Sequence, residues 1–240
     1  KVSEQGFSFG TEFEQYENIF FSPELAFAIE DLETNDTASD QLKKQEGNYH
    51  DFYFNYGLKY DLRNSKYNPT SGNRTSFYQQ LPIISDNNEF SNTLIFTQYK
   101  NLNKASDMVG KASFYFQNIN TLDNSDVRVS KRGNIPYNRL RGFEKGKIGP
   151  VDNDKYVGGN YVSAINLSTN LPGVLSTIES VDFSYFIDFA NVWGVDYDSS
   201  IDDSNQIRSS TGIGMNLLTP VGPLSFSLAH PIKKKETDKT

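Results

Sequence analysis

The chain has 240 residues, of which 23 are basic and 30 acidic, so its formal net charge is −7. This acidic balance argues against a nucleic-acid-binding protein, which normally presents a basic face. The sequence contains no cysteine, which excludes a disulfide framework, a zinc–thiolate site and a cysteine nucleophile. It also lacks any run of about 20 apolar residues that would form a membrane-spanning helix.

Alternation with a period of two residues predicts ten strands and no substantial helix. The clearest segment places Phe52, Phe54 and Leu58 on one side of a strand, and Asn55 and Asp61 on the other. The 18 Phe and 14 Tyr residues, against 1 Trp and 2 Met, also favour strands. In chain order, the predicted strands cover residues 6–14, 18–31, 50–63, 73–83, 90–100, 107–119, 159–171, 179–193, 208–219 and 223–231.

The connections between these strands alternate in length. Those after the odd-numbered strands are short, whereas those after the even-numbered strands are mostly longer, including 32–49, 120–158 and 194–207; residues 84–89 are the exception. Long strands with short turns at one end only are typical of an antiparallel outer-membrane β-barrel. Because such a barrel turns polar residues into its lumen, an apolar content of 36 % is compatible with it. A soluble antiparallel barrel or sandwich, whose strands also alternate, is the alternative.

The longest connection, residues 120–158, carries a distinctive series of short motifs. These are Arg141-Gly142-Phe143, then Ile148-Gly149-Pro150, and Gly158-Gly159-Asn160 at the start of the next strand. This order resembles the sixth extracellular loop of the BamA family of outer-membrane-protein insertases. The resemblance extends to four further segments, at residues 68–72, 188–193, 219–224 and 231–240, and so covers essentially the whole chain.

The resemblance implies an all-β transmembrane barrel of the bacterial outer-membrane type. Residues 1–240 would supply about ten strands of a sixteen-strand barrel. The first strands, the POTRA domains and the last strand are then expected to lie outside this chain, and the loop at 120–158 is expected to fold inward. Unpaired edges are heavily penalised in lipid, so we expect further chain or a partner to cover them.

The implied function is the folding and insertion of β-barrel proteins into the outer membrane of a Gram-negative bacterium. The family carries this out without enzymatic chemistry, so no catalytic residue, metal or cofactor is expected. The implied partners are unfolded β-barrel clients, outer-membrane lipids and the accessory lipoproteins of an assembly complex, with no nucleic acid.

The resemblance also implies that Arg141 docks its guanidinium on a carboxylate inside the lumen. Asp188 lies on the polar side of its strand by parity and is the expected partner. Gly142 would permit a tight backbone, and Phe143 would pack on the barrel wall. Ser168 stands where the family often has Glu, so a second acidic partner is expected to be missing. The alternatives are an exposed loop arginine and a solvated lumen carboxylate.

Three other functions stay open at this point. A related translocating barrel, TamA or a two-partner secretion transporter, shares the same plan. A barrel enzyme would place His50 or His230 beside a carboxylate or serine at the membrane rim. A passive porin would use the long loop as a constriction with rings of charged side chains.

Overall fold

The computed structural model describes residues 1–240 except 104, 106, 173–180, 204 and 220–221. The elements are β1 (Val2–Gly10), β2 (Phe13–Tyr16), β3 (Ile19–Leu32), α1 (Asp40–Lys43), β4 (Gly47–Asp61), β5 (Gly72–Ser85), β6 (Glu89–Asn103), β7 (Met108–Thr121), β8 (Val151–Asp152), β9 (Lys155–Tyr156), β10 (Tyr161–Asn170), β11 (Val181–Trp193), β12 (Arg208–Thr219) and β13 (Gly222–Lys233). The predicted all-β fold is confirmed. No helix in the described ranges has the length and apolarity needed to cross a membrane.

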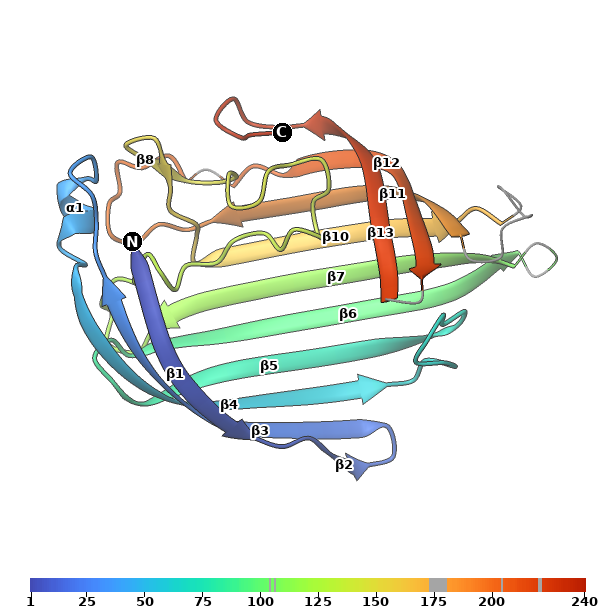
Figure 1. Ribbon diagram of the computed structural model, residues 1–240, viewed down its shortest axis with the longest axis horizontal. Helices are drawn as coiled ribbons and strands as arrows, with labels where there is room; N and C mark the ends of the chain where they lie inside the picture. Colours follow the sequence, from blue (N-terminus) through green and yellow to red (C-terminus); the bar gives the residue numbers. More distant parts are fainter. Residues whose placement is uncertain (104, 106, 173–180, 204, 220–221) are drawn as a thin grey trace.

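All the long strands belong to one antiparallel sheet. Its order is β1-β3-β4-β5-β6-β7-β10-β11-β12-β13, with β2 paired to β3, while β8 and β9 form a separate hairpin. Figure 1 shows that the sheet is strongly curved and that the loop between β7 and β10 lies within its concave side. Within the described residues, β1 and β13 are the two edges and do not pair with each other. The chain therefore forms an open barrel wall.

The first strand differs most from its predicted boundaries. β1 begins at Val2 and ends at Gly10, whereas the prediction was 6–14; it pairs with β3 from Val2 opposite Leu32 to Gly10 opposite Glu24. Because the chain must reverse before β3, the alternating run is broken and Phe13 falls in the separate strand β2. The long loop contains the β8–β9 hairpin. The predicted strand start at residue 179 lies outside the described residues.

The two faces of the sheet differ in polarity. In β4, Asp51 and Tyr53 point inward and are buried, whereas Leu58 and Tyr60 point outward and are exposed. The same outward exposure is found along the wall, at Leu25, Ile29, Ile165, Leu167 and Ile213. An apolar outer face and a polar inner face are what a barrel wall in hydrocarbon requires.

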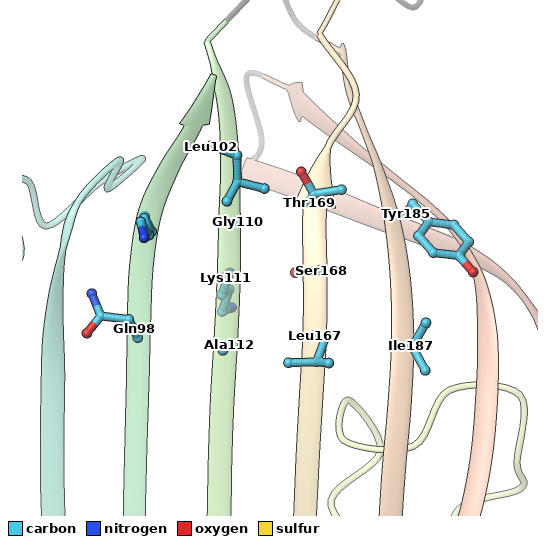
Figure 2. Close-up of a pocket in the computed structure, with 11 residues that line it drawn as sticks. Gln98, Leu102, Gly110, Lys111, Ala112, Leu167, Ser168, Thr169, Tyr185 and Ile187 are labelled. Carbon is cyan, nitrogen blue, oxygen red and sulfur yellow. The ribbon is translucent and has the colours of Figure 1, made fainter. Parts of the chain in front are cut away.

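The outer face carries a shallow apolar groove of about 410 Å³ across β6, β7, β10 and β11. It forms because Gly110 and Ala112 have little or no side chain, while larger residues stand on the neighbouring strands. Figure 2 shows Leu102 beside Gly110, with Leu167 and Ile187 along the other side. The groove thus continues the apolar character of the outer wall.

Candidate functional site

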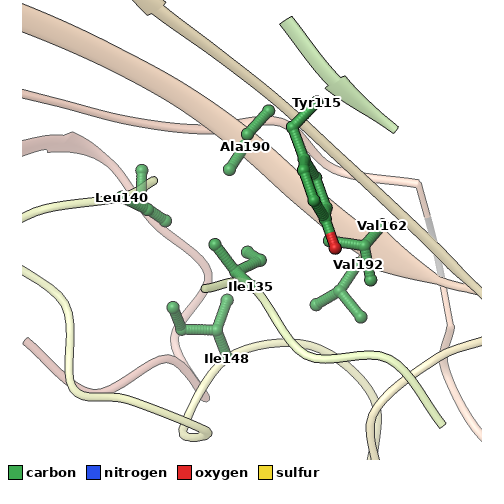
Figure 3. Close-up of a cluster of buried hydrophobic side chains, with 8 residues drawn as sticks. Tyr115, Ile135, Leu140, Ile148, Val162, Ala190 and Val192 are labelled. Carbon is green, nitrogen blue, oxygen red and sulfur yellow. The ribbon is translucent and has the colours of Figure 1, made fainter. Parts of the chain in front are cut away.

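The loop of residues 122–160 is packed against the inner face of the sheet. Its apolar side chains form one buried cluster with side chains of β7, β10 and β11, and Figure 3 shows the two groups facing each other. The cluster consists of Ile135, Leu140 and Ile148 from the loop and Tyr115, Val162, Ala164, Ala190 and Val192 from the strands. Burial of these side chains holds the loop inside the lumen.

Arg141, at the inner tip of this loop, is bound to the wall by Asp188 of β11. Its Nε donates to Asp188 Oδ2 and its Nη2 to Oδ1, both at 2.8 Å, and its backbone N–H donates to Oδ2 at 3.2 Å. The Asp188 side chain is fully buried. The guanidinium carbon also lies 3.3 Å from the centre of the Phe186 ring. This fork and stacking geometry needs the planar guanidinium of arginine and not the point charge of lysine.

Asn166 completes the surroundings of this pair. It lies opposite Asp188 in the β10–β11 register, and its amide donates to Asp188 Oδ1 and to the carbonyl oxygen of Arg139, each at 2.8 Å. Ser168, where a second acidic partner was expected to be missing, lies opposite Phe186 and not opposite Asp188. The polar neighbour of the ion pair on β10 is therefore a neutral amide.

The tip also contacts β13. Gly142 has a φ of +87°, and a Cβ at this position would lie 3.0 Å from the Cβ of Ala229. A side chain here would therefore be strained both by the backbone and by the wall. Phe143 is half-buried and packs against the apolar cluster. The tip is thus held between β11 and β13.

The remaining motif residues lie where the loop returns to the sheet. Gly149 lies against Val192, Pro150 is fully buried, and Gly158 lies against Gly133. Gly159 exchanges two backbone hydrogen bonds with Gly133, at 2.8 and 3.0 Å. A Cβ on Gly159 would lie 2.3 Å from the carbonyl oxygen of Trp193, which leaves room for glycine alone. Asn160 accepts from Arg132 at 2.8 Å and donates to Asp196 at 2.7 Å.

Arg128, near the start of the loop, is an anchor that the sequence analysis missed. The residue is 1 % exposed and lies over the ring of Tyr49. Its Nη2 donates to Asp51 of β4 and to Glu89 of β6, both at 2.7 Å, and its backbone N–H donates to Glu89 at 2.6 Å. The available sequence signal was the position of Asp51 on the polar side of the clearest alternating strand.

Further ion pairs lie at this end of the barrel wall, and two of them are formed by loop residues. Arg132 binds Asp196, Lys131 binds Glu30, and Arg208 of β12 binds Asp238 in the C-terminal segment. Burial acts to raise the pKa of Asp196, but the Arg132 charge and the hydrogen bonds from Asn160 and Arg132 outweigh it, so the pKa lies below its usual value. The long loop is therefore tied by charge to several segments of the rim.

Of the histidines named for the barrel-enzyme alternative, His50 lies beside a carboxylate. His50 Nδ1 lies 3.3 Å from Asp86 Oδ2, so one requirement of the barrel-enzyme alternative is met, but both side chains are more than half exposed. The neighbouring Ser85 hydroxyl lies instead within hydrogen-bond distance of Asp51 and of a backbone carbonyl. In the described ranges, no group of three acidic or histidine side chains is placed to hold a metal ion.

Comparison with known proteins places the chain among outer-membrane barrels. The sequence profile of the Omp85 superfamily domain matches residues 1–240. The sequence is 30 % identical to the outer membrane protein assembly factor BamA of Neisseria meningitidis serogroup B, in an alignment that covers 42 % of this chain and 16 % of the relative. It is also 30 % identical to the BamA of Neorickettsia risticii, over 42 % of this chain and 14 % of that protein.

The fold is similar to that of a solved structure. The crystal structure of BamA from Haemophilus ducreyi lacking POTRA domains 1–3 superposes with a TM-score of 0.86 at 24 % sequence identity. The match covers 99 % of this chain and 52 % of that chain. The sequence thus spans about half of the solved protein and a smaller share of the curated relatives.

Proposed function

Because the chain belongs to the Omp85 superfamily and has the fold of a BamA barrel wall, we propose that its protein folds and inserts β-barrel proteins into the bacterial outer membrane. It is an outer-membrane β-barrel protein, as are its relatives. Insertion requires no covalent bond to be made or broken in a substrate.

The observation that carries the proposal is the inward-docked loop tip, in which Arg141 is bound to Asp188. A passive porin needs an open, water-filled lumen with charged rings. Here the loop covers the inner face of β7, β10 and β11 with apolar contacts, and two of its arginines, Arg128 and Arg141, are paired with carboxylates of the wall. A conduction path along this wall would have to displace a packed and ion-paired segment.

We propose that residues 1–240 supply ten strands of a larger barrel and that residues 120–158 stiffen this wall from the inside. The loop links β4 and β6 through Arg128, β11 through Arg141 and β13 through Gly142. Because these links span most of the wall, an opening for clients would form more easily at another seam of the barrel. Clients would pair there through exposed backbone groups, as strands add to any free sheet edge.

The proposed partners follow from the same arrangement. Unfolded β-barrel clients would meet an open edge, outer-membrane lipids would contact the exposed apolar face, and accessory lipoproteins would bind parts of the protein outside the membrane. A related translocating barrel, of the TamA or two-partner secretion type, is the second candidate, because the superfamily match covers the whole chain without distinguishing between these functions.

Genetic replacement tests the proposal. The full-length protein is expressed in its host while the host's own copy is depleted, and folded porin in the outer membrane is measured by its heat-modifiable mobility. Wild-type protein is expected to restore folded porin, and Arg141→Ala to restore much less at equal protein level. Lys43→Ala, in the exposed helix α1, is the matched control and should behave as wild type. Normal porin assembly without the protein would refute the insertase function and favour the translocating alternative.

A further inference from the structure

A second cavity lies inside the barrel wall, between the loop and the strands β4 to β6. Its volume is about 220 Å³. Three of its lining residues are arginines from separate segments: Arg63 follows β4, Arg74 lies at the start of β5, and Arg139 comes from the inward loop. The rest of the lining is Ser76, Ile95, Thr97 and Tyr99. Guanidinium groups from the loop and from the wall thus meet in one small space.

The positive charge of this cavity is only partly neutralised. Arg63 is paired with Asp61, with Nε–Oδ1 and Nη2–Oδ2 distances of 2.8 and 2.7 Å. Arg74 donates its Nε to the hydroxyl of Ser76 at 3.3 Å. In the part of the chain that the structure describes, the Arg74 guanidinium has no carboxylate oxygen within 4.0 Å.

Arg139, which the loop contributes to the cavity, likewise has no ion pair among the described residues. Its Nη1 donates to Ser113 Oγ at 2.7 Å and to Asn166 Oδ1 at 3.2 Å, both neutral acceptors, and the described residues supply no carboxylate within 4.0 Å. By contrast, Arg128 and Arg141 of the same loop each bind a buried carboxylate. Lys111 adds another positive charge beside the cavity, because its Nζ lies 5.8 Å from the centre of the Tyr99 ring, which is part of the lining. This excess occurs in a chain whose net charge is −7.

We propose that this cavity binds a phosphate-type oxyanion. Guanidinium groups recognise phosphate oxygens in fork geometry, and hydroxyls such as those of Ser76 and Thr97 can donate further hydrogen bonds. A phosphate ester carries a charge of about −1.5 to −2 at pH 7, which matches the two unpaired arginines better than a carboxylate does. The cavity is smaller than the roughly 300–1,000 Å³ of drug-sized sites, so the ligand is a free phosphate or a small phosphate monoester headgroup.

The position of the site gives the anion a structural effect. An oxyanion held by Arg139 and Arg74 would join the inward loop to the β4–β5 wall, in addition to the contact of Arg141 with Asp188. Its negative charge would offset the repulsion among the arginines and Lys111. The proposal concerns the barrel lumen alone and does not depend on the proposed insertion of clients.

The test uses the full-length protein in detergent, with binding followed by isothermal titration calorimetry. Inorganic phosphate, glycerol 3-phosphate and acetate are the three probes, measured at constant ionic strength because exposed charges are screened by salt. Arg74→Gln is the main variant, since Arg74 lies on the wall and its guanidinium makes one side-chain hydrogen bond among the described residues. Arg139→Gln is the second variant. Lys100→Gln removes one positive charge from the outer face of β6 and is the matched control.

Binding of phosphate or glycerol 3-phosphate is expected, with a loss of at least tenfold in affinity for Arg74→Gln and for Arg139→Gln, and less than twofold for Lys100→Gln. Tighter binding of inorganic phosphate would indicate the free ion as ligand, and tighter binding of glycerol 3-phosphate would indicate a lipid headgroup. The proposal is overturned if neither phosphate compound binds, if acetate binds as tightly, or if Arg74→Gln, shown to be folded by its heat-modifiable mobility, keeps wild-type affinity.

Discussion

Arg128 and Arg141 belong to the same inward loop, but the barrel wall holds them in different ways. Arg128 is buried between two carboxylates, Asp51 and Glu89, from strands β4 and β6. Arg141 has one carboxylate, Asp188, and an aromatic ring beneath it, and its side chain is 24 % exposed. Only Arg141 stands in a recognisable motif. The motif thus marks a position at the loop tip, while the more deeply buried anchor carries no local sequence signature.

The comparison predicts that Arg128→Ala is the most damaging change. It leaves the Asp51 and Glu89 carboxylates buried without a cation, and breaking a buried pair in this way costs about 3–5 kcal/mol. We expect the free energy of unfolding to fall by an amount at the upper end of this range, when the full-length protein in detergent is unfolded with guanidinium chloride. Lys43→Ala removes an exposed pair with Asp40 and should cost less than about 0.5 kcal/mol. A loss below about 1 kcal/mol for Arg128→Ala would show that this anchor does not hold the loop.

Arg141→Ala and Asp188→Ala should each have a smaller effect, of about 3 kcal/mol, because one carboxylate is involved and the guanidinium is partly solvated. The double variant should be little worse than either single one, since both remove the same interaction. Arg141→Lys should restore only part of the stability, because an ammonium cannot make the fork. The free energy of unfolding of these variants is measured in the same way as for Arg128→Ala. Effects that simply add in the double variant would argue against a direct pair.

Substitutions at Gly142 and Gly146 can distinguish the effect of contact with the wall from the effect of backbone strain. Gly142 and Gly146 both have positive φ, but only Gly142 has an atom of the wall near its Cβ position. Gly146→Ala should therefore cost about 1 kcal/mol from the backbone alone. Gly142→Ala should cost about 2 kcal/mol, because the contact with Ala229 is added. Equal losses in the unfolding assay would mean that β13 does not confine the tip.

The smallest effect is expected at the rim, where Asp196 faces Arg132. The pKa of Asp196 is lower in the folded protein than in the unfolded chain, so its contribution to stability is present above about pH 4 and is lost as the pH falls through the folded value. Hydrogen exchange of residues 194–203 should therefore be unchanged from pH 7 to 5, after correction for intrinsic rates, and rise below about pH 4. Asp196→Asn should remove this acid dependence. If hydrogen exchange already rose near pH 6, a group other than Asp196 would be responsible.

The alternation of apolar and polar residues along the sequence was sufficient to predict much of this fold. In β4, the positions of Phe52, Phe54 and Leu58 against Asn55 and Asp61 established which side faces outward, because side chains of a strand alternate strictly between its faces. The same parity placed Asp188 on the inner side of β11. The glycines and Arg141 could be identified as loop residues because they stand together in one local motif.

The tertiary structure decided which distant residues meet. Arg128 lies 77 residues from Asp51 and 39 from Glu89 along the chain, and nothing in the local pattern joins them. Asn166, not Ser168, lies beside Asp188 because the β10–β11 register sets cross-strand neighbours. The cationic cavity likewise depends on how deeply the loop inserts, which brings Arg139 to Arg63 and Arg74. Alternation determines the face on which a side chain lies, but register and loop packing determine its partner.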